Sequence, residues 1–541
     1  MLLRGFTIAL LALLASPLAG LGQAQPNVLI VIADDVGVDA LGMYGIGTDQ
    51  PNTPNLDALA AEGIRFDNAW AYPTCAPTRA AMLTGLYGNK TDVLTVPGHL
   101  DLGFTTLFEQ VAAVTSRAYA VASIGKWHLA RGNNLTNPND QGADHFVGFM
   151  GGAVSDYYAW ERVENGVASA STAYTTSQLT DEAIAWIGEQ RQPWLLWLAH
   201  GAAHTPFHVP PSSLFTRTRT ASNLDQYLAT IEALDHEIGR LLDAMPPAER
   251  ANTLVLFVGD NGTPRQVLQG FPSGRGKGTL YEGGLRVPLI AAGAGVTRVG
   301  ETETAPVHVL DVFATVTEVL GTDLDGGINN SFSFKDLLSD AAAPTRPYNL
   351  SEVTSDTQDA VAIRDAQYKL IASAEGQQEF YDLLADPFER NDLTLSGLTA
   401  AQLAALATLE AEARAQTAGW SCNDGILNGD EQPGDCSVAT STQDAIPGSS
   451  VVLWQNAPNP FRSTTTIRYT LPEHVITVRL AVFDMMGRRV ATLVDEAQPA
   501  GLQAVSWHGT DAAGQALPSG VYLYQFRAGA VTHTRKMVLL R

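Results

Sequence analysis

The sequence is poor in positive charge, which limits what the protein can bind. Its 541 residues include 33 lysines and arginines against 56 aspartates and glutamates, a net charge of −23 at pH 7. A general binder of nucleic acid or of anionic membranes needs a basic surface, so this balance argues against both classes. An anionic substrate would need a locally positive site. The basic residues include only six lysines: Lys90, Lys126, Lys277, Lys335, Lys369 and Lys536.

Cysteine is equally scarce. The chain has three cysteines, an odd number for a protein in an oxidising compartment. Cys422 and Cys436 flank a loop rich in glycine, aspartate and asparagine, and a disulfide between them could close it. Cys75 is then left alone, either as a buried structural thiol or as a reactive group.

Long apolar runs are also rare, and the first one is short. Arg4 precedes an apolar run from Phe6 to Leu14, which Pro17 and a small-residue segment ending at Ala24 follow. This order is typical of a secretory signal peptide, so residues 1–24 are left out of the fold and a location outside the cytoplasm is expected. An N-terminal membrane anchor is the alternative, but the run is short for one.

Four short apolar runs are each followed at once by polar side chains. They cover residues 28–32, 119–124, 194–198 and 254–258, and amphipathic helices are expected between them, at 55–62 and 223–242. Near-continuous apolar runs of this length indicate parallel strands buried on both faces. The alternation predicts an α/β domain over residues 25–344, with its ligands at the carboxyl ends of the strands.

The pattern changes after about residue 345. Short strands at 362–364, 368–371 and 379–383, followed by a helix at 399–416, predict a small antiparallel α+β subdomain over 345–418. Residues 419–450 are polar and form an expected linker that carries the Cys422–Cys436 loop. Alternating strands separated by turn residues then predict an Ig-like β-sandwich over 451–541.

The surroundings of Cys75 predict chemistry. Pro77 suits the first turn of a helix and Gly85 suits its end, so Cys75 is expected at a helix N-terminus. Backbone N–H groups and the helix dipole favour anions there. Arg79 lies one turn further along and can reach back as a planar cation. The segment therefore predicts a reactive group beside an anion-binding site.

Cys75-x-Pro77-x-Arg79 with Leu83-Thr84-Gly85 resembles the signature of the type I sulfatases, whose fold is alkaline-phosphatase-like. Thr78 stands where serine is commoner, and Leu86 where a basic residue is common. The resemblance extends in family order over roughly residues 26–395. The matching segments are 27–35, 53–57, 63–66, 125–128, 204–206, 260–262, 276–279, 282–286 and 381–383.

The resemblance implies that Cys75 is oxidised to formylglycine, an aldehyde, by a formylglycine-generating or anaerobic sulfatase-maturing enzyme. One hydroxyl of the hydrated aldehyde attacks the sulfur of a sulfate ester and the other allows sulfate to be expelled, which splits one hard step into two. An ordinary serine lacks the second hydroxyl. Arg79 would stabilise the ionised hydrate, His128 would take its proton in the second step, and His204 would protonate the leaving alcohol.

Lys126 and Lys277 would hold the sulfate oxygens as point charges. Two of only six lysines thus fall within strand-end motifs, and neither is predicted to be a core residue. The oxygen donors at the strand ends suit Ca²⁺, which takes about 6–8 oxygen ligands, with Mg²⁺ as the lesser alternative. No Cys/His cluster in the sequence offers a zinc site. The expected metal ligands are Asp34, Asp35, Asp260, Asn261 and an oxygen of the modified Cys75.

Residues 451–541 carry a second resemblance. Segments 456–461, 483–488, 519–522 and 536–540 resemble the type A sorting domain of bacterial type IX secretion. This implies a partner in the outer-membrane secretion machinery, followed by release or attachment at the cell surface. The strand pattern alone would equally fit an Ig-like carbohydrate-binding domain.

The sequence is therefore interpreted as a secreted, calcium-dependent formylglycine sulfatase that acts on sulfated sugars or polysaccharide fragments. Two alternatives stay open: a phosphonate or phosphodiester hydrolase on the same scaffold, and a catalytically silent glycan-binding protein. A phosphate-loop interpretation of Gly274-x-Gly276-Lys277-Gly278 fails, because Gly278 replaces the required Ser or Thr. The weaker candidates for contacts with the substrate are Tyr157, Tyr158, Trp160, His200, His208 and Arg265.

Overall fold

The computed structural model describes residues 25–324, 327–354, 359–373, 377–395, 397–417, the backbone of 421–422 and 434–435, and most of 452–541. The expected signal peptide and Cys436, one partner of the expected disulfide, lie outside the described residues. The chain divides into two units, residues 1–439 and 440–541, and each is described by itself.

The first unit is built on a ten-stranded sheet in the order β11-β2-β10-β9-β1-β8-β4-β5-β6-β7. At its centre β1 (Asn27–Ala33) lies between β9 (Thr253–Gly259) and β8 (Trp194–Ala199), and β8 pairs with β4 (Ala120–Lys126). All three pairings are parallel, and the strands are buried along almost their whole length. These are the four apolar runs, so the predicted parallel sheet is confirmed.

Shorter strands extend the sheet on both sides. β10 runs antiparallel to β9, and β2 antiparallel to β10, whereas β5 continues the parallel order from β4. The bounds of these flanking strands are β2 (Gly63–Phe66), β5 (His145–Phe149), β6 (Trp160–Glu164), β7 (Val167–Ser171), β10 (Leu289–Gly293) and β11 (Glu301–Glu303).

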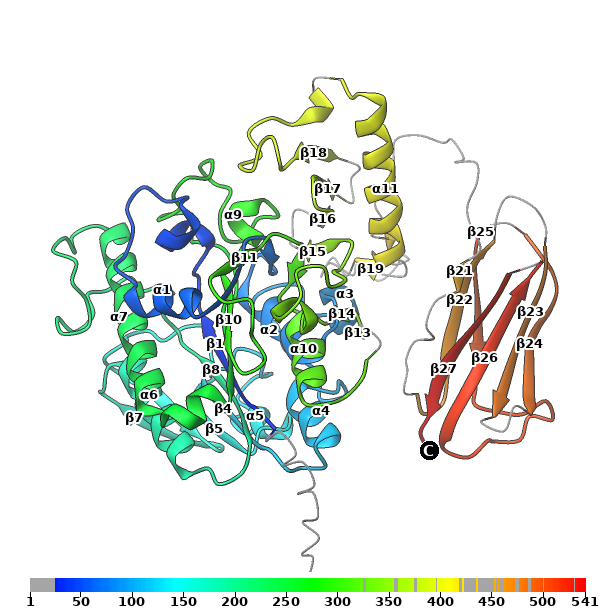
Figure 1. Ribbon diagram of the computed structural model, residues 1–541, viewed down its shortest axis with the longest axis horizontal. Helices are drawn as coiled ribbons and strands as arrows, with labels where there is room; N and C mark the ends of the chain where they lie inside the picture. The colour runs from blue at the N-terminus through cyan, green and yellow to red at the C-terminus, as the bar shows by residue number, and fades with distance from the viewer. Residues whose placement is uncertain are drawn as a thin grey trace, which may run out of the picture. The chain divides into compact units, whose positions relative to one another are not determined.

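Helices cover both faces of this sheet (Figure 1). One face packs against α1 (Pro54–Ala61), α6 (Thr175–Glu189) and α7 (Asn223–Ala244). The other packs against α2 (Cys75–Thr84), α4 (Leu107–Val114) and α10 (Asp311–Val319). Successive side chains of a strand point to opposite faces, so β1 contributes residues to both cores. The α/β fold is as predicted.

Several short elements complete this part of the unit. The two-stranded pairings are β3 (Ala69–Trp70) with β12 (Val307–His308), and β13 (Gly327–Ile328) with β14 (Ser331–Phe332). The short helices are α3 (Gly88–Thr91), α5 (Asn137–Asp140), α8 (Pro247–Ala251) and α9 (Glu282–Leu285). Single 3₁₀ turns are found at Val38–Ala40, Gly42–Tyr44, Asp336–Leu338 and Leu393–Leu395.

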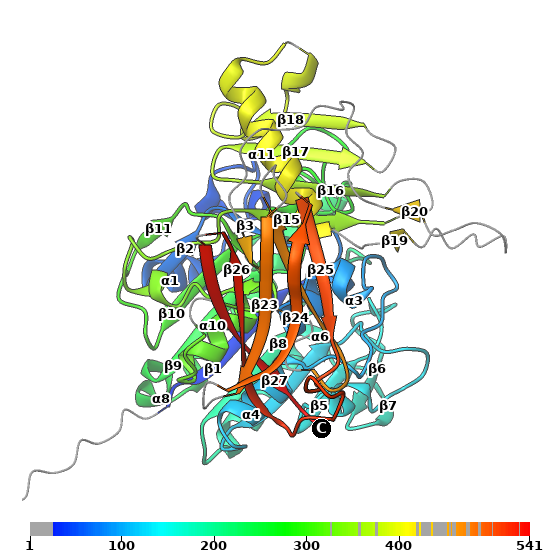
Figure 2. The same cartoon turned by 90° about the vertical axis from the view of Figure 1, so that its right-hand side faces the viewer.

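A smaller antiparallel sheet follows in the same unit. It contains β15 (Asn349–Val353), β16 (Ala360–Arg364), β17 (Tyr368–Ser373) and β18 (Gln378–Asp382) in chain order. The helix α11 (Ala400–Thr417) packs on it, and the two share a buried apolar core (Figure 2). The last three strands and the helix fall where the sequence predicts them, whereas β15 is not predicted.

The second unit is a β-sandwich, as expected. One sheet has the order β21-β22-β25 and the other β24-β23-β26-β27, and aromatic and aliphatic side chains fill the core between them. The strands are β21 (Val452–Leu453), β22 (Thr465–Leu471), β23 (Ile476–Asp484), β24 (Arg489–Gln498), β25 (Gly501–Trp507), β26 (Gly520–Ala528) and β27 (Val531–Leu539). A two-stranded pairing, β19 (Ser421–Cys422) with β20 (Gly434–Asp435), belongs to the first unit. No helix among the described residues combines the length and apolar character needed to cross a bilayer.

Candidate active site

The carboxyl ends of four neighbouring strands meet at one edge of the large sheet. Asp34 follows β1, Asp260 follows β9, His204 lies beyond the end of β8, and Lys126 is the last residue of β4. Because these strands are adjacent and parallel, side chains 226 residues apart in the chain come into contact, as Asp35 and Asn261 do. The edge is where an open α/β sheet binds its ligands.

Cys75 is the first residue of α2, as expected. Pro77 lies in the first turn, and Gly85 ends the helix in a left-handed conformation with φ of 64°. The Thr78 hydroxyl accepts a hydrogen bond from the Tyr72 amide at 3.1 Å and so fixes the turn that precedes the cysteine. Cys75 is 2% exposed, and burial raises the pKa of its thiol.

Two carboxylates lie beside that sulfur. The Cys75 Sγ atom and one oxygen each of Asp34 and Asp260 all lie within 4.8 Å of one another. Arg79 donates to Asp260 Oδ2 at 2.8 and 3.1 Å and to the carbonyl of Lys126 at 2.9 Å. Burial raises the pKa of Asp260, but the positive charges of Arg79 and the two site lysines outweigh it, so the pKa is lowered. The pKa of Asp34, by contrast, is raised, because its burial outweighs the positive charge of Lys126.

Two buried oxygens of the site have no hydrogen-bond partner. Asn261 donates through Nδ2 to Asp35 Oδ1 at 2.8 Å, which leaves its own Oδ1 unpaired. Asp34 Oδ1 is unpaired as well. A buried oxygen without a partner is costly. Three carboxylates and an amide, two of whose buried oxygens are unpaired, fit a hard divalent cation. A softer metal prefers sulfur or imidazole donors.

The two lysines of the site differ in exposure. Lys126 is fully buried and its Nζ lies 2.6 Å from Asp34 Oδ2. The expectation that it lies outside the core is therefore wrong, because α2 covers the end of β4 through the bond from Arg79 to the Lys126 carbonyl. The Lys277 side chain is 21% exposed and its Nζ lies 2.5 Å from Asp35 Oδ1. Burial lowers the pKa of each lysine, but the nearby negative charges raise it by more. The pKa of each lysine is therefore above its ordinary value, and both are charged.

His128 is held as a neutral imidazole. Burial and the charges of Lys126 and Arg79 lower its pKa to about 2. Its backbone φ is 64°, and its ring lies against Gly152, where a Cβ would come within 2.4 Å of the ring nitrogen Nε2. Its Nδ1 atom is buried without a hydrogen-bond partner. The ring therefore has an unprotonated nitrogen that could take a proton, although a pKa this low makes it a weak base beside Lys126 and Arg79.

His204 enters the site from the loop after β8. Its Nδ1 lies 2.8 Å from the carbonyl of Thr205, which can only accept, so Nδ1 carries a proton. Its Nε2 lies 3.7 Å from Asp35 Oδ2 and faces the other polar groups. His200, by contrast, is fully buried, and burial lowers its pKa to about 3, in keeping with a structural role.

A family comparison decides the assignment. The sulfatase family model matches residues 26–322, more than half of the chain. The chain belongs to the sulfatase family. It is thus a sulfuric ester hydrolase. The second unit matches the FlgD Ig-like domain over residues 461–533.

Curated relatives resemble this sulfatase over a little more than half of its length. Mouse arylsulfatase G is 29% identical over 373 residues, 58% of this chain and 68% of the relative. Pig N-acetylgalactosamine-6-sulfatase is 31% identical over 353 residues, 58% of this chain and 66% of the relative. The chain thus spans about two thirds of the length of these relatives.

Solved structures share the fold. The structure of Ps i-CgsB in complex with k-i-k-neocarrahexaose is 24% identical, with a TM-score of 0.62 over 72% of this chain and 92% of the other. The phosphonate monoester hydrolase of Agrobacterium radiobacter is 20% identical, with a TM-score of 0.55 over 72% and 96%. The same fold is therefore found in a phosphonate monoester hydrolase as well.

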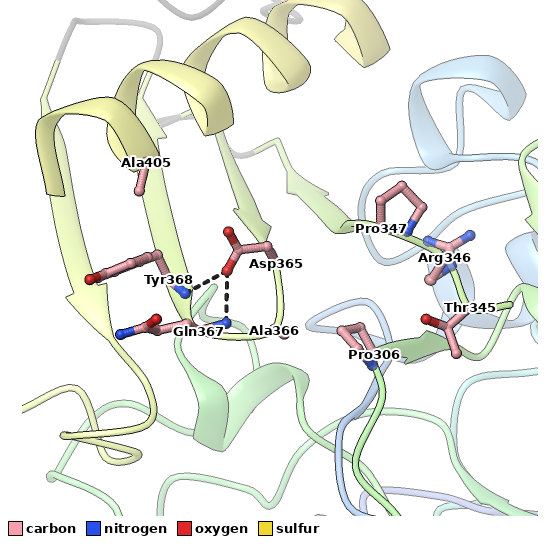
Figure 3. Close-up of a pocket in the computed structure, with 9 residues that line it drawn as sticks. All are labelled: Pro306, Thr345, Arg346, Pro347, Asp365, Ala366, Gln367, Tyr368 and Ala405. Carbon is pink, nitrogen blue, oxygen red and sulfur yellow. Dashed lines mark hydrogen bonds between the residues drawn. The ribbon is translucent and has the colours of Figure 1, made fainter. Parts of the chain in front are cut away.

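The sulfatase also has a cavity away from these residues. About 420 Å³ in volume, it is lined by the turn between β16 and β17, the segment before β15 and Ala405 of α11 (Figure 3). Its carboxylate, Asp365, accepts hydrogen bonds from the amides of Gln367 and Tyr368 at 2.7 Å. None of the expected site residues lines it, and it is not the active site.

All ten expected site residues come together, and the structure adds two supporting roles. Thr78, a position of the signature, fixes the turn before Cys75, and Gly152 makes room for the His128 ring. Gly152 has no signal in a single sequence, since glycine is common in loops. Of the weaker candidates, Tyr157 is buried, whereas Arg265 is exposed and donates to the carbonyls of Lys277 and Gly278.

Proposed function

We propose that the protein hydrolyses sulfate esters of sugars or polysaccharide fragments, through a formylglycine derived from Cys75 and a bound calcium ion. The observation that carries the proposal is the enclosure of Cys75 at the N-terminus of a buried helix by charged groups of both signs. The acidic members fit a cation and the basic members fit an anion. A sulfate ester held beside a metal needs both.

The groups that would hold calcium are Asp34, Asp35, Asp260 and Asn261, together with an oxygen at position 75. The support is the set of carboxylate and amide oxygens, two of which, Asp34 Oδ1 and Asn261 Oδ1, are buried and unpaired. When bound, the ion supplies positive charge next to the reacting centre. Formylglycine would supply the nucleophilic hydroxyl of its hydrate.

The remaining side chains would act on the substrate directly. Lys126 and Lys277 are charged and would bind sulfate oxygens, where their charge stabilises the transition state. The neutral His128 would accept a proton at Nε2 or Nδ1. His204 would donate a proton from Nε2 to the oxygen of the leaving alcohol.

The names of related proteins support a sugar substrate. The relatives include N-acetylgalactosamine-6-sulfatases, and one structure of the same fold holds D-glucosamine-2-N,6-O-disulfate as its substrate. Both names refer to sulfated amino sugars. We therefore propose a sulfated sugar here as well.

One set of substrates tests the proposed function. The sulfate monoester, phosphate monoester, phosphate diester and phosphonate monoester of the same aryl alcohol share a leaving group and differ in the transferred group. We expect kcat/KM to be highest for the sulfate in protein matured with calcium. A higher value for the phosphonate or the diester would favour a phosphonate or phosphodiester hydrolase. No turnover of any ester would favour the glycan-binding alternative.

Lys277→Ala should lower the rate of sulfate ester hydrolysis by roughly 10²–10³, the scale for the loss of one electrostatic stabiliser. Its side chain is partly exposed, so the fold should survive, whereas Lys126→Ala would also leave Asp34 buried without its cation. The exposed Lys335→Ala is the matched control. Steady-state kinetics and circular dichroism check both effects. Normal turnover by folded Lys277→Ala would remove this lysine from the site.

We also propose that the protein is exported by residues 1–24 and sorted across the outer membrane by residues 451–541. The support is the pair of resemblances in the sequence and the separate Ig-like unit. A sulfatase-maturing enzyme would act on Cys75, because formylglycine does not form unaided.

Deleting residues 451–541 should leave the turnover of a small aryl sulfate unchanged, because every residue of the candidate site lies in the first unit. In a host with type IX secretion, the same deletion should strand the enzyme in the periplasm. Activity assays on cell fractions measure both outcomes. Normal export with weaker binding to sulfated polysaccharide would instead support a carbohydrate-binding module.

A further inference from the structure

The loop that carries His204 has backbone hydrogen bonds up to His204, whose own amide donates to the Gly201 carbonyl at 3.0 Å. At its start, the His200 and Ala203 amides donate to the carbonyls of Ile32 and Asp34, which ties it to β1. Beyond His204 the chain contains Pro206, Pro210 and Pro211, which have no N–H group to donate. Side chains must therefore hold this part of the loop in place.

Tyr157 provides such support from the loop between β5 and β6. It is 2% exposed, and its hydroxyl lies 2.5 Å from the carbonyl of Gly201 and 2.8 Å from the carbonyl of His204. Both carbonyls can only accept, so the single phenolic proton is shared between them. Tyr157 is itself anchored, because the Thr175 amide and hydroxyl at the start of α6 both donate to its carbonyl at 2.9 Å.

A second ring holds Tyr157 from the other side. His208, four residues after His204, stacks on the Tyr157 ring with centroids 4.1 Å apart and an angle of 24° between the planes. Its Nδ1 lies 3.0 Å from the Pro206 carbonyl, so it donates there, and its Nε2 accepts from the Tyr174 hydroxyl at 3.1 Å. The loop is thus held at residues 201 and 204 by the Tyr157 hydroxyl and at His208 by the Tyr174 hydroxyl.

We propose that Tyr157, held by His208 and Tyr174, is a positioning residue that fixes His204 for proton donation to the leaving alcohol. The inference rests on the proposed function, in which His204 is the acid. The backbone of His204 is held by Tyr157 and its ring by the Thr205 carbonyl, so the direction of Nε2 is set at both ends. An error of about 1 Å in such an arrangement can cost about a hundredfold in rate.

The test uses substrates that differ in their need for an acid. Phenyl sulfate has a poor leaving group that requires a proton, whereas para-nitrophenyl sulfate releases a stable phenolate without one. Tyr157→Phe keeps the ring and its stacking but removes the hydroxyl. We expect kcat/KM to fall about tenfold or more with phenyl sulfate, a part of the 10²–10⁴ that an acid supplies, and to change little with para-nitrophenyl sulfate.

Tyr119→Phe is the matched control. The Tyr119 hydroxyl also donates to a backbone carbonyl, that of Pro26 at 2.7 Å, and the side chain is also buried, but it lies before the first residue of β4, at the opposite end of the strand from the site. Both substrates should be cleaved at the wild-type rate. Tyr174→Phe, which frees His208 Nε2, is the second variant and should repeat the Tyr157→Phe pattern at smaller size.

A double-mutant cycle completes the test. In a His204→Gln background the hydroxyl of Tyr157 has no acid to position, so adding Tyr157→Phe should cause no further loss with phenyl sulfate. An equal fall with both substrates, or losses that multiply in the double variant, would overturn the role of Tyr157 alone. Wild-type protein that cleaves neither sulfate would overturn the proposed function instead.

Discussion

Replacing Cys75 with alanine is expected to lower the turnover of an aryl sulfate by about 10⁶-fold, the scale seen when a catalytic nucleophile is removed. The reason is chemical, since alanine offers neither a thiol to be oxidised nor a hydroxyl. Cys75 is buried at the start of α2, and a smaller apolar side chain should leave the helix intact. Steady-state kinetics and thermal unfolding of the purified variant measure the two effects.

Cys75→Ser separates two explanations of that loss. A serine hydroxyl can attack the sulfur, but without a second hydroxyl it cannot expel sulfate by the proposed route. We expect release of a single equivalent of alcohol and then arrest, which a burst assay detects. Mass spectrometry of the Cys75 peptide in active wild-type enzyme should show the aldehyde. Full activity with an unmodified thiol would contradict the formylglycine proposal.

Replacing Lys369 with methionine should destabilise the protein by about 3–5 kcal/mol, the cost of removing one partner from a buried ion pair. Lys369, on β17, is fully buried, with Nζ 3.0 Å from Glu282 and 2.7 Å from Glu389. Both carboxylates are buried as well. The variant would leave Glu389 without its cation and Glu282 with Arg364, 3.5 Å away, as its remaining partner. Urea or thermal unfolding followed by circular dichroism gives the change in stability.

Lys335→Met is the control for this prediction, since it makes the same exchange at an exposed position. Its stability should stay close to that of the wild type. Adding Glu389→Gln to Lys369→Met should recover part of the loss, because the acid that has lost its cation then carries no charge. Equal stability of Lys369→Met and Lys335→Met would show that the buried cluster contributes nothing.

The sequence alone predicts the elements that carry the site because the relevant signals are local. Each apolar run is followed directly by its polar residues, and Pro77 and Gly85 mark the two ends of one helix. Parallel strands then bring their carboxyl ends to one edge, so Asp34 and Asp260 can be grouped before their contacts are known. The resemblance to a family adds the roles of Lys126, Lys277 and the histidines.

Other features depend on contacts that no local pattern specifies. The neighbours of β1 are β9 and β8, an order set by which apolar faces pack together rather than by sequence position. The complete burial of Lys126 follows from Arg79, 47 residues away, which covers the end of its strand. The hydroxyl of Tyr157 meets carbonyls 44 and 47 residues further along the chain.

The ion cluster around Lys369 also bears on how this chain can be divided. The family match ends at residue 322, yet Glu282 within it is buried, accepts from Trp70 and pairs with a lysine of the later sheet. A protein that ends at residue 322 would keep Glu282 and lose Lys369, its partner. The part of the chain that carries the site therefore depends on residues 360–389 for this ion pair. We expect a chimera with the later sheet of a relative to be stable only where the residues at 282 and 369 still form an ion pair.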